Sequence, residues 1–277
     1  MVTSIYKSIK AFLQDRPLKN GTMIKGKYEI VETLGMGSYG ITYLVRDTRQ
    51  QNKLYVLKQT KPSRRKDEKS KLSYHYETNI LGTLNHPAIP KIHENFFFKD
   101  DFYFTMEFIN GNTFEDLIFH KGKTYTENEA FQILQQLLVI VKYIHNENIV
   151  HRDLRIPNII VVKNQLHLID FGLARYIGDK PTVHAERLSD YMIEKQLKRE
   201  VTFQSDFYSL GHFLLFLLYS DYTPSSKVER SWEEELPISK FSKEILRKML
   251  QIKEPYHHID ELIHAVNHRL KIFDNNM

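Results

Sequence analysis

The residues best suited to chemistry lie in three separate stretches, and the first is rich in glycine. Residues 34–40 read LGMGSYG, with glycines at positions 35, 37 and 40. Glycine permits tight turns and lets backbone N–H groups approach phosphate oxygens, because no Cβ stands in the way. A dinucleotide-binding fold would continue into a helix, whereas residues 41–45 (ITYLV) are typical of a strand. The pattern therefore argues against that fold and predicts a loop at the tip of a hairpin.

The second stretch offers a lysine and a glutamate. Lys58 ends the strand-like run YVLK, 18 residues beyond Gly40, and Glu77 lies in a helical stretch further along the chain. Taken singly, a lysine that alternates out of an apolar strand and a glutamate on a helix are usually solvated. Together they could form an ion pair that aims the ammonium group at phosphates.

The third stretch holds two motifs, HRDLRIPN at residues 151–158 and DFG at residues 170–172. Asp170 follows Asp153 by 17 residues, which leaves room for one short hairpin. Aspartate and asparagine are common turn formers, so Asp153, Asn158 and Asp170 also have a purely structural interpretation. The combined spacing of the motifs favours a functional site.

In the order GMGSYG, VLK, a helical glutamate, HRDLRIPN and DFG, the sequence resembles the eukaryotic-type (Hanks-type) serine/threonine protein kinase family, as a small stand-alone bacterial-like member. The resemblance covers about residues 28–270, and SDFYSLG at residues 205–211 resembles the central buried helix of that family. It implies an α+β, two-lobed protein-kinase-like fold, with a small antiparallel β lobe that carries one main helix and a larger helical lobe.

The resemblance also implies catalytic roles. Asp153 is expected to accept the proton of the substrate hydroxyl, and Asn158 and Asp170 are expected to ligate Mg²⁺. Arg155 stands where serine kinases usually carry lysine, and it keeps a positive charge beside the transferred phosphoryl group. Asp206 is expected to anchor the backbone of the catalytic loop.

For ATP, the resemblance implies a pocket between the lobes. Lys58, held by Glu77, is expected to contact the α- and β-phosphates beneath the backbone of residues 35–40. The other expected nucleotide contacts are Gly35, Gly37 and Gly40 in the loop, Leu34, Thr42, Val56 and Ile160 as the lining, Met106 as the gatekeeper, and the backbones of Glu107 and Ile109 at adenine.

The segment before Asp206 departs from the family pattern, because residues 182–205 contain neither the usual Gly-Thr nor an Ala-Pro-Glu. Glu194 is the expected counterpart of the final glutamate. Thr182 is a candidate phosphosite that could pair with Arg152.

The amino-acid composition excludes several other classes of protein. The chain has 277 residues, of which 42% are hydrophobic, and it has no cysteine, which excludes disulfide scaffolds, iron–sulfur clusters and thiol catalysis. The net charge is +5, and residues 61–71 carry six basic against two acidic side chains. We interpret that run as a solvated segment that leads into the Glu77 helix, and we expect no nucleic-acid partner.

The apolar run at residues 213–219 is far shorter than the roughly 20 residues of a membrane span, so no transmembrane segment is expected.

Hydrophobic periodicity predicts the elements that must position these residues. Strands are expected at residues 28–34, 41–45, 54–59, 92–98, 102–108, 159–162 and 166–169, and helices around Glu77 and at residues 127–145, 206–219, 241–252 and 259–272. The predicted domains are an N-terminal amphipathic extension at 1–27, a β lobe at 28–109 and a helical lobe at 110–277, with a cleft where the lobes meet.

The sequence therefore predicts a cytoplasmic, Mg²⁺-dependent protein kinase that transfers the γ-phosphoryl group of ATP to serine or threonine of protein substrates, itself included. A pseudokinase that keeps the fold as a binding module is the main alternative. A small-molecule kinase and a tyrosine kinase are the others. The protein substrate, the activating input and the oligomeric state do not follow from the sequence.

Overall fold

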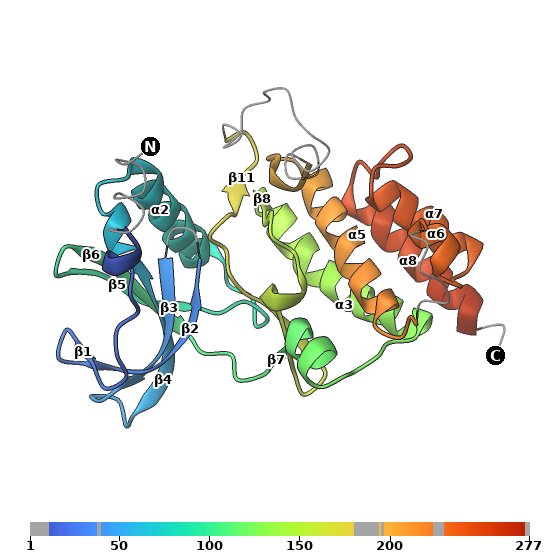
Figure 1. Ribbon diagram of the computed structural model, residues 1–277. Coiled ribbons are helices and arrows are strands. Elements are labelled where there is room, and N and C mark those ends of the chain that lie inside the picture. The colour runs from blue at the N-terminus through green and yellow to red at the C-terminus, as the bar shows by residue number, and fades with distance from the viewer. Residues whose placement is uncertain (1–10, 38–39, 180–193, 195–196, 224–229, 275–277) are drawn as a thin grey trace, which may run out of the picture. The chain divides into compact units, whose positions relative to one another are not determined.

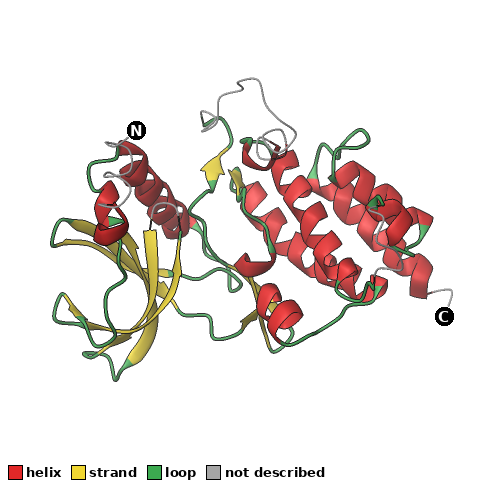
Figure 2. Cartoon of the chain, viewed as in Figure 1, coloured by secondary structure: helices red, strands yellow, loops and turns green. Residues whose placement is uncertain are grey.

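The computed structural model describes residues 11–37, 40–179, 194, 197–223 and 230–274. The chain divides into two compact units, residues 1–110 and 111–277. The first is built mainly of strands and the second mainly of helices (Figure 2). This separation of strands from helices is the predicted α+β class.

Unit 1 contains a six-stranded antiparallel sheet in the order β1-β2-β3-β4-β6-β5 (Figure 1). Its strands are β1 (Met23–Ile24), β2 (Tyr28–Met36), β3 (Gly40–Asp47), β4 (Lys53–Thr60), β5 (Ile92–Phe98) and β6 (Asp101–Glu107). A turn of 3₁₀ helix, η1 (Pro62–Arg64), and the helix α2 (Glu68–Thr83) connect β4 to β5. Each of these strands except β1 matches a run rich in β-branched and aromatic residues, which fit a pleated surface well.

One face of the sheet carries an apolar core that is rich in tyrosine. Its buried members are Ile24, Tyr28, Ile30, Ile41, Tyr43, Val45, Tyr55, Leu57 and Tyr103. A buried phenol needs a partner for its hydroxyl. The Tyr43 hydroxyl donates to Gln59 at 3.0 Å and accepts the backbone N–H of Leu18 at 3.1 Å, and the Tyr55 hydroxyl donates to Gln50 at 3.1 Å. The rim of this core is therefore held by directed hydrogen bonds as well as by apolar contact.

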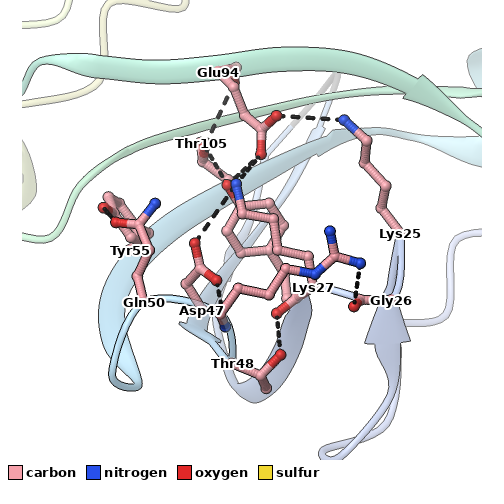
Figure 3. Close-up of polar contacts among 11 residues, drawn as sticks. Lys25, Gly26, Lys27, Asp47, Thr48, Gln50, Tyr55, Glu94 and Thr105 are labelled. Atoms are coloured by element: carbon pink, nitrogen blue, oxygen red, sulfur yellow. Dashed lines mark hydrogen bonds and ion pairs between the residues drawn. The ribbon is translucent and has the colours of Figure 1, made fainter.

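A polar cluster joins the two edges of the sheet (Figure 3). Glu94 on β5 accepts hydrogen bonds from the Tyr28 hydroxyl and from the Lys27 ammonium group, the latter at 2.7 Å. Lys25 lies 3.4 Å from the other oxygen of Glu94, and Lys27 also lies 3.5 Å from the buried carboxylate of Asp47. Lys25 and Lys27 lie in the turn between β1 and β2, whereas Glu94 lies on β5 at the other end of the strand order, so these contacts require the sheet to curl.

The cluster remains charged over a wide pH range. Burial alone raises the pKa of Glu94, but hydrogen bonds from Lys27 and Tyr28 outweigh burial and lower that pKa to about 2. Burial and the contact with Glu94 raise the pKa of Tyr28 to about 12. A glutamate whose pKa is depressed on folding stabilises the native state above its unfolded pKa, and it loses this effect as the pH falls through the folded value.

Helix α2 starts and stops at sequence signals. The Asp67 carboxylate caps its first turn by accepting the N–H of Lys69 at 2.9 Å, and the helix ends three residues before His86 and Pro87. Arg65, just before the helix, donates to both oxygens of the buried Asp101 at 2.5 and 2.9 Å. Arg65 is exposed, as the solvated interpretation of the basic run expects, but it is also tied to the sheet through Asp101.

Residues 11–24 also pack on unit 1. The Asp15 carboxylate accepts the N–H of Ser63 at 2.9 Å and its hydroxyl at 2.7 Å. Thr22 and Ile30 are linked by a backbone hydrogen bond of 3.0 Å beside the β1–β2 pair. Residues 1–10 of the predicted amphipathic extension lie outside the described residues.

Unit 2 is a bundle of helices with short strand pairs beside it. Its helices are η2 (Asp116–His120), α3 (Glu127–Asn146), η3 (Ile156–Asn158), α5 (Phe203–Tyr219), α6 (Trp232–Glu235), α7 (Lys240–Met249) and α8 (Ile259–Asp274). Its strands are β7 (Asn112–Thr113), β8 (Ile149–Val150), β9 (Ile159–Val162), β10 (Gln165–Leu168) and β11 (Arg175–Tyr176). Thr126 and Glu129 form a capping box that starts α3.

A buried arginine ties three of these helices together. Arg269 of α8 donates to Ser242 of α7 at 3.2 Å and to Asn128 of α3 at 2.6 Å, and it lies 3.0 Å from the Glu127 carboxylate. Its guanidinium group also covers the Phe131 ring at 4.6 Å. This network therefore connects α3, α7 and α8 through one side chain.

The apolar run at residues 213–219 forms the second half of α5, which is buried along most of its length. Within the described ranges, no helix combines the length and the apolar character that crossing a bilayer requires.

Replacing Glu94 with glutamine tests the polar cluster. Glu94→Gln leaves Lys27 with a weaker neutral partner, and we expect it to lower the free energy of unfolding by about 2 kcal/mol at pH 7. It is also expected to reduce the loss of stability between about pH 4.5 and pH 2, where the native carboxylate titrates differently from the unfolded one. Urea unfolding at a series of pH values measures both effects. The exposed Glu32→Gln is the control, and equal effects of the two substitutions would contradict the prediction.

Candidate active site

One face of the unit 1 sheet gathers residues that the sequence assigns to a nucleotide. Thr42 on β3 pairs with Lys58 on β4, and Val56 on β4 pairs with Met106 on β6. Directly paired residues project from the same face, and so do Lys58 and Val56, which are two residues apart. Val56 and Met106 are buried, whereas Thr42 and Lys58 are partly exposed. The structure therefore brings these four positions together on one surface.

The Lys58 ammonium group lies 2.5 Å from the Glu77 carboxylate. The lysine side chain is 15% exposed and the glutamate side chain 8% exposed. Glu77 stands on α2, so this contact links the helix to strand β4 across the face of the sheet. A partly exposed ammonium group held by a buried carboxylate has a defined direction, which suits it to binding an anion.

The glycine-rich run connects β2 and β3 as a hairpin. Gly35 pairs with Thr42, and the N–H of Gly37 donates to the carbonyl of Gly40 at 2.9 Å. A Cβ at Gly40 would approach the carbonyl oxygen of Gln59 to 3.0 Å, so a larger residue would crowd the neighbouring strand. Leu34 and the glycines at 35 and 37 are exposed, and residues 38–39 lie outside the described chain.

The last part of β6 carries the residues expected at adenine. The backbone N–H of Glu107 donates to Lys91 at 2.9 Å, so this group is already used within unit 1. Ile109 follows outside the strand and is partly exposed. Ile160 belongs to unit 2, where it lies buried on β9 and pairs with Thr113 and His167.

In unit 2, a fully buried carboxylate holds the loop that contains HRDLRIPN. Asp206 of α5 accepts the backbone N–H of His151 at 2.9 Å and that of Arg152 at 2.7 Å, and it also bonds the His145 ring at 2.9 Å. Burial raises the pKa of Asp206, but the hydrogen bond from His145, the electrostatic interaction with His145 and His151, and the backbone N–H of Arg152 lower it overall. The sequence suggested the anchoring role of Asp206, but nothing in it pointed to His145.

Two residues of the motifs adopt left-handed backbone angles, Arg152 with φ of 65° and Asp170 with φ of 62°. This region costs energy for residues other than glycine and persists where the surroundings hold it. The contacts that hold Arg152 are hydrogen bonds of its buried guanidinium group, which donates to the carbonyl of Leu173 at 3.1 Å and to that of Arg199. Burial, Arg175 and Arg199 lower the pKa of Arg152 to about 10.

Asp153 stands at the centre of a small polar cluster. The amide of Asn158 donates to the Asp153 carbonyl at 2.9 Å and to its carboxylate at 2.8 Å. Arg155 donates to the same carboxylate oxygen at 3.2 Å. The Asp153 side chain is 14% exposed and that of Arg155 61% exposed, so the cluster faces outward from a supported loop.

The DFG motif is tied to the same loop. The N–H of Ile169 donates to the Asn158 carbonyl at 3.0 Å, and β9 and β10 form the short hairpin between the motifs. The rings of Phe171 and His151 contact edge to face with centroids 4.7 Å apart. The Gly172 N–H donates to the Asp170 carboxylate at 3.3 Å. Asp153, Asn158 and Asp170 thus stand on two backbone segments that are bonded to each other.

Glu194 has partners that the sequence did not indicate. Its carboxylate lies 2.5 Å from Lys198 and 3.7 Å from His212 of α5. Thr182 lies outside the described residues. Within those ranges, no group of three or more histidine, aspartate and glutamate side chains is arranged to hold a metal ion.

Asp206→Asn tests the anchor of this loop. An asparagine in the same orientation turns an N–H donor toward a backbone N–H, so one buried donor loses its acceptor. We expect the free energy of unfolding to fall by about 3 kcal/mol in urea titrations. Asp260→Asn, which removes an exposed pair with Lys142, is expected to cost less than about 1 kcal/mol. Equal losses in the two variants would contradict the anchoring role.

Comparison with known proteins gives these clusters a context. The chain matches the protein kinase domain family over residues 28–272. It is 38% identical to the probable serine/threonine-protein kinase YbdM of Bacillus subtilis, over 96% of this chain and 98% of that protein. It is 28% identical to serine/threonine-protein kinase B of Synechocystis over 84% of this chain, which spans 44% of that longer protein.

The fold comparison agrees. The crystal structure of the Mycobacterium tuberculosis PknI kinase domain aligns with a TM-score of 0.67 at 20% identity, over 91% of this chain and 99% of that one. At this identity the likeness concerns the fold alone. Because the family match spans most of the chain and YbdM is matched along almost its whole length, the chain belongs to the protein kinase domain family.

Proposed function

We propose that the chain is an active serine/threonine protein kinase that transfers the γ-phosphoryl group of ATP to protein substrates. The observation that carries the proposal is the supported carboxylate of Asp153, one oxygen of which accepts hydrogen bonds from both Asn158 and Arg155. A base that takes the proton of an attacking hydroxyl must be fixed in direction and open to substrate. Asp153 meets both requirements, because its loop is anchored from beneath by Asp206.

The residues present fit a magnesium ion. Asn158 donates to Asp153 through its amide nitrogen, which leaves its oxygen as a candidate ligand, and Asp170 adds a carboxylate. Such oxygen donors suit Mg²⁺, which is usually held by one or two protein groups together with phosphates. When bound, the ion would neutralise charge on the phosphate oxygens of ATP. In this proposal, Asn158 also keeps Asp153 oriented toward the acceptor hydroxyl.

Unit 1 would contribute the remaining nucleotide contacts. The Lys58 ammonium group, directed by Glu77, would bind the α- and β-phosphates, and the backbone of residues 35–40 would cover them. Leu34, Thr42, Val56, Met106 and Ile160 would line the base site, with Glu107 and Ile109 offering backbone groups to adenine. The proposal requires the Lys58 pair and the Asp153 cluster to act on one nucleotide.

Specificity for serine and threonine is supported by the names of the two relatives described above, both of which are serine/threonine-protein kinases. Arg155 keeps a cation beside the acceptor but stands where serine kinases usually carry lysine, so it leaves tyrosine specificity as the alternative. Self-phosphorylation would be one reaction of such an enzyme.

A pseudokinase is the second candidate, and one observation favours it. The sequence before α5 lacks the usual Gly-Thr and Ala-Pro-Glu, and Glu194 pairs with the nearby Lys198. Such a protein would bind nucleotide or a protein partner without transferring phosphate. The complete set of Lys58, Glu77 and the Asp153 cluster supports the enzyme instead.

Transfer of labelled phosphate from ATP, with Mg²⁺ and a generic protein substrate, tests the proposal. Asp153→Asn is expected to lower kcat by roughly 10²–10⁴-fold, because it removes the base while keeping the shape of the side chain. Binding of MgATP, measured by the rise in melting temperature, is expected to remain. Asp221→Asn, an exposed position in the same unit, is the control and should retain full activity.

Two outcomes would contradict the proposal in different ways. A wild-type protein that is stabilised by MgATP but transfers no phosphate is a pseudokinase. Label that survives Asp153→Asn undiminished would show that another group acts as the base. Phosphoamino-acid analysis of the product distinguishes serine and threonine from tyrosine.

A further inference from the structure

A cavity of about 320 Å³ opens beside Asp153 within unit 2. Its walls come from the HRDLRIPN loop, from Glu194, Lys198 and Arg199, and from α5. The lining residues that matter here are Asp153, Arg155, Glu194, Lys198, Arg199 and Ser209. The volume lies in the range of about 300–1,000 Å³ typical of ligand sites. A substrate that presents a hydroxyl to Asp153 therefore has room beside it for a neighbouring side chain.

The charged groups of this cavity are unevenly paired. Lys198 lies 2.5 Å from Glu194, so these two charges offset each other. Arg155 contacts Asp153 only through its Nε atom, at 3.2 Å, and its side chain is 61% exposed. The guanidinium group of Arg199 makes no hydrogen bond or ion pair with any residue that the structure describes. Two arginines consequently present donors to the cavity that its acidic side chains leave unused.

A third arginine adds to the positive potential. Arg152 lines the same cavity, but its guanidinium group is occupied by the carbonyls of Leu173 and Arg199. Burial, followed by the charges of Arg175 and Arg199, lowers the pKa of Arg152 to about 10. A lowered pKa of an arginine means that its proton is disfavoured by nearby positive charge as well as by burial. An anion placed here would relieve that repulsion.

We infer that this cavity binds an acidic side chain of the protein substrate, close in sequence to the residue that is phosphorylated. Arg199 and Arg155 would donate to its anionic oxygens, in the fork geometry that guanidinium groups share with carboxylates and phosphates. A basic neighbour would meet like charges, and a neutral one would leave the arginine donors without anionic partners. The inference rests on the proposed function, because it takes Asp153 as the group that receives the acceptor hydroxyl.

Peptide binding tests the inference directly, without requiring phosphate transfer. Four fluorescent peptides share one acceptor serine and differ in its neighbours, which are glutamate, glutamine, phosphoserine or lysine. Fluorescence anisotropy with the full chain measures each dissociation constant at low and at high salt. We expect the glutamate peptide to bind at least fivefold more tightly than the glutamine peptide at low salt, with the difference shrinking at high salt. A comparison of the dissociation constants of the phosphoserine and glutamate peptides shows whether the cavity binds phosphate more tightly than carboxylate.

Substitution of Arg199 assigns the preference to this cavity. Arg199→Gln is expected to abolish most of the glutamate preference, and Arg199→Lys to retain part of it, because lysine keeps the charge but loses the fork. Arg230→Gln, at an exposed position of the same unit, is the matched control and should keep the preference. The Arg199 carbonyl, which accepts from Arg152, remains in each variant.

Two results would overturn the inference. One is equal binding of the glutamate and glutamine peptides by the wild-type chain. The other is a glutamate preference that survives Arg199→Gln. A failure of the proposed function looks different, because the glutamate preference would then persist while neither peptide is phosphorylated. If Arg199→Gln does not fold, Arg199→Lys and the salt dependence of the wild-type protein still decide the matter.

Discussion

The buried carboxylate of Asp206 is the interaction on which the arrangement of unit 2 depends. It lies inside the helical bundle and receives two consecutive backbone N–H groups, those of His151 and Arg152. Removing a carboxylate from water costs free energy. The two backbone hydrogen bonds and the bond to His145 offset that cost. The carboxylate thereby holds Arg152 in a left-handed conformation and directs Asp153 outward. The placement of the loop at residues 151–158 thus follows from the hydrogen bonds that satisfy one buried carboxylate.

Unit 1 uses charge in two different ways. In the cluster around Glu94, the charged groups satisfy each other and join the edges of the curled sheet. In the Lys58–Glu77 pair, the glutamate is buried while the lysine stays partly exposed. The first arrangement stabilises the fold, and the second leaves an ammonium group able to bind a further anion. The difference between them lies in exposure, which the sequence alone does not report.

Much of the architecture could be predicted from hydrophobic periodicity. The long helices α3 and α8 begin at the predicted residue, and β5 and β9 have the predicted bounds. The two-residue strands were missed, because pieces as short as β8 carry no periodic signal and exist through their partners. The contact between Arg65 and Asp101 was missed for a similar reason. Its partner Asp101 is 36 residues away, and no local pattern indicates such a contact.

The candidate site was predictable to a different degree. The spacing of the motifs predicted Asp153, Asn158 and Asp170 as site residues. The structure adds the hydrogen bonds that connect their backbone segments. It also adds His145 beneath Asp206 and the carbonyl of Arg199 beside Arg152, which depend on the packing of distant segments. The open donors of Arg199 could not have been recognised from the sequence, because basic residues in such a segment are usually solvated.

The proposed function requires that both Lys58 of unit 1 and Asp170 of unit 2 contribute to the binding of MgATP. A double-mutant cycle on MgATP affinity tests it most directly, with Lys58→Met, Asp170→Asn and the double variant measured by calorimetry. If both groups hold the same triphosphate, the two losses of binding free energy will be non-additive by about 0.5–3 kcal/mol. Losses that add to within about 0.5 kcal/mol would mean that the two groups act independently, and would contradict the claim.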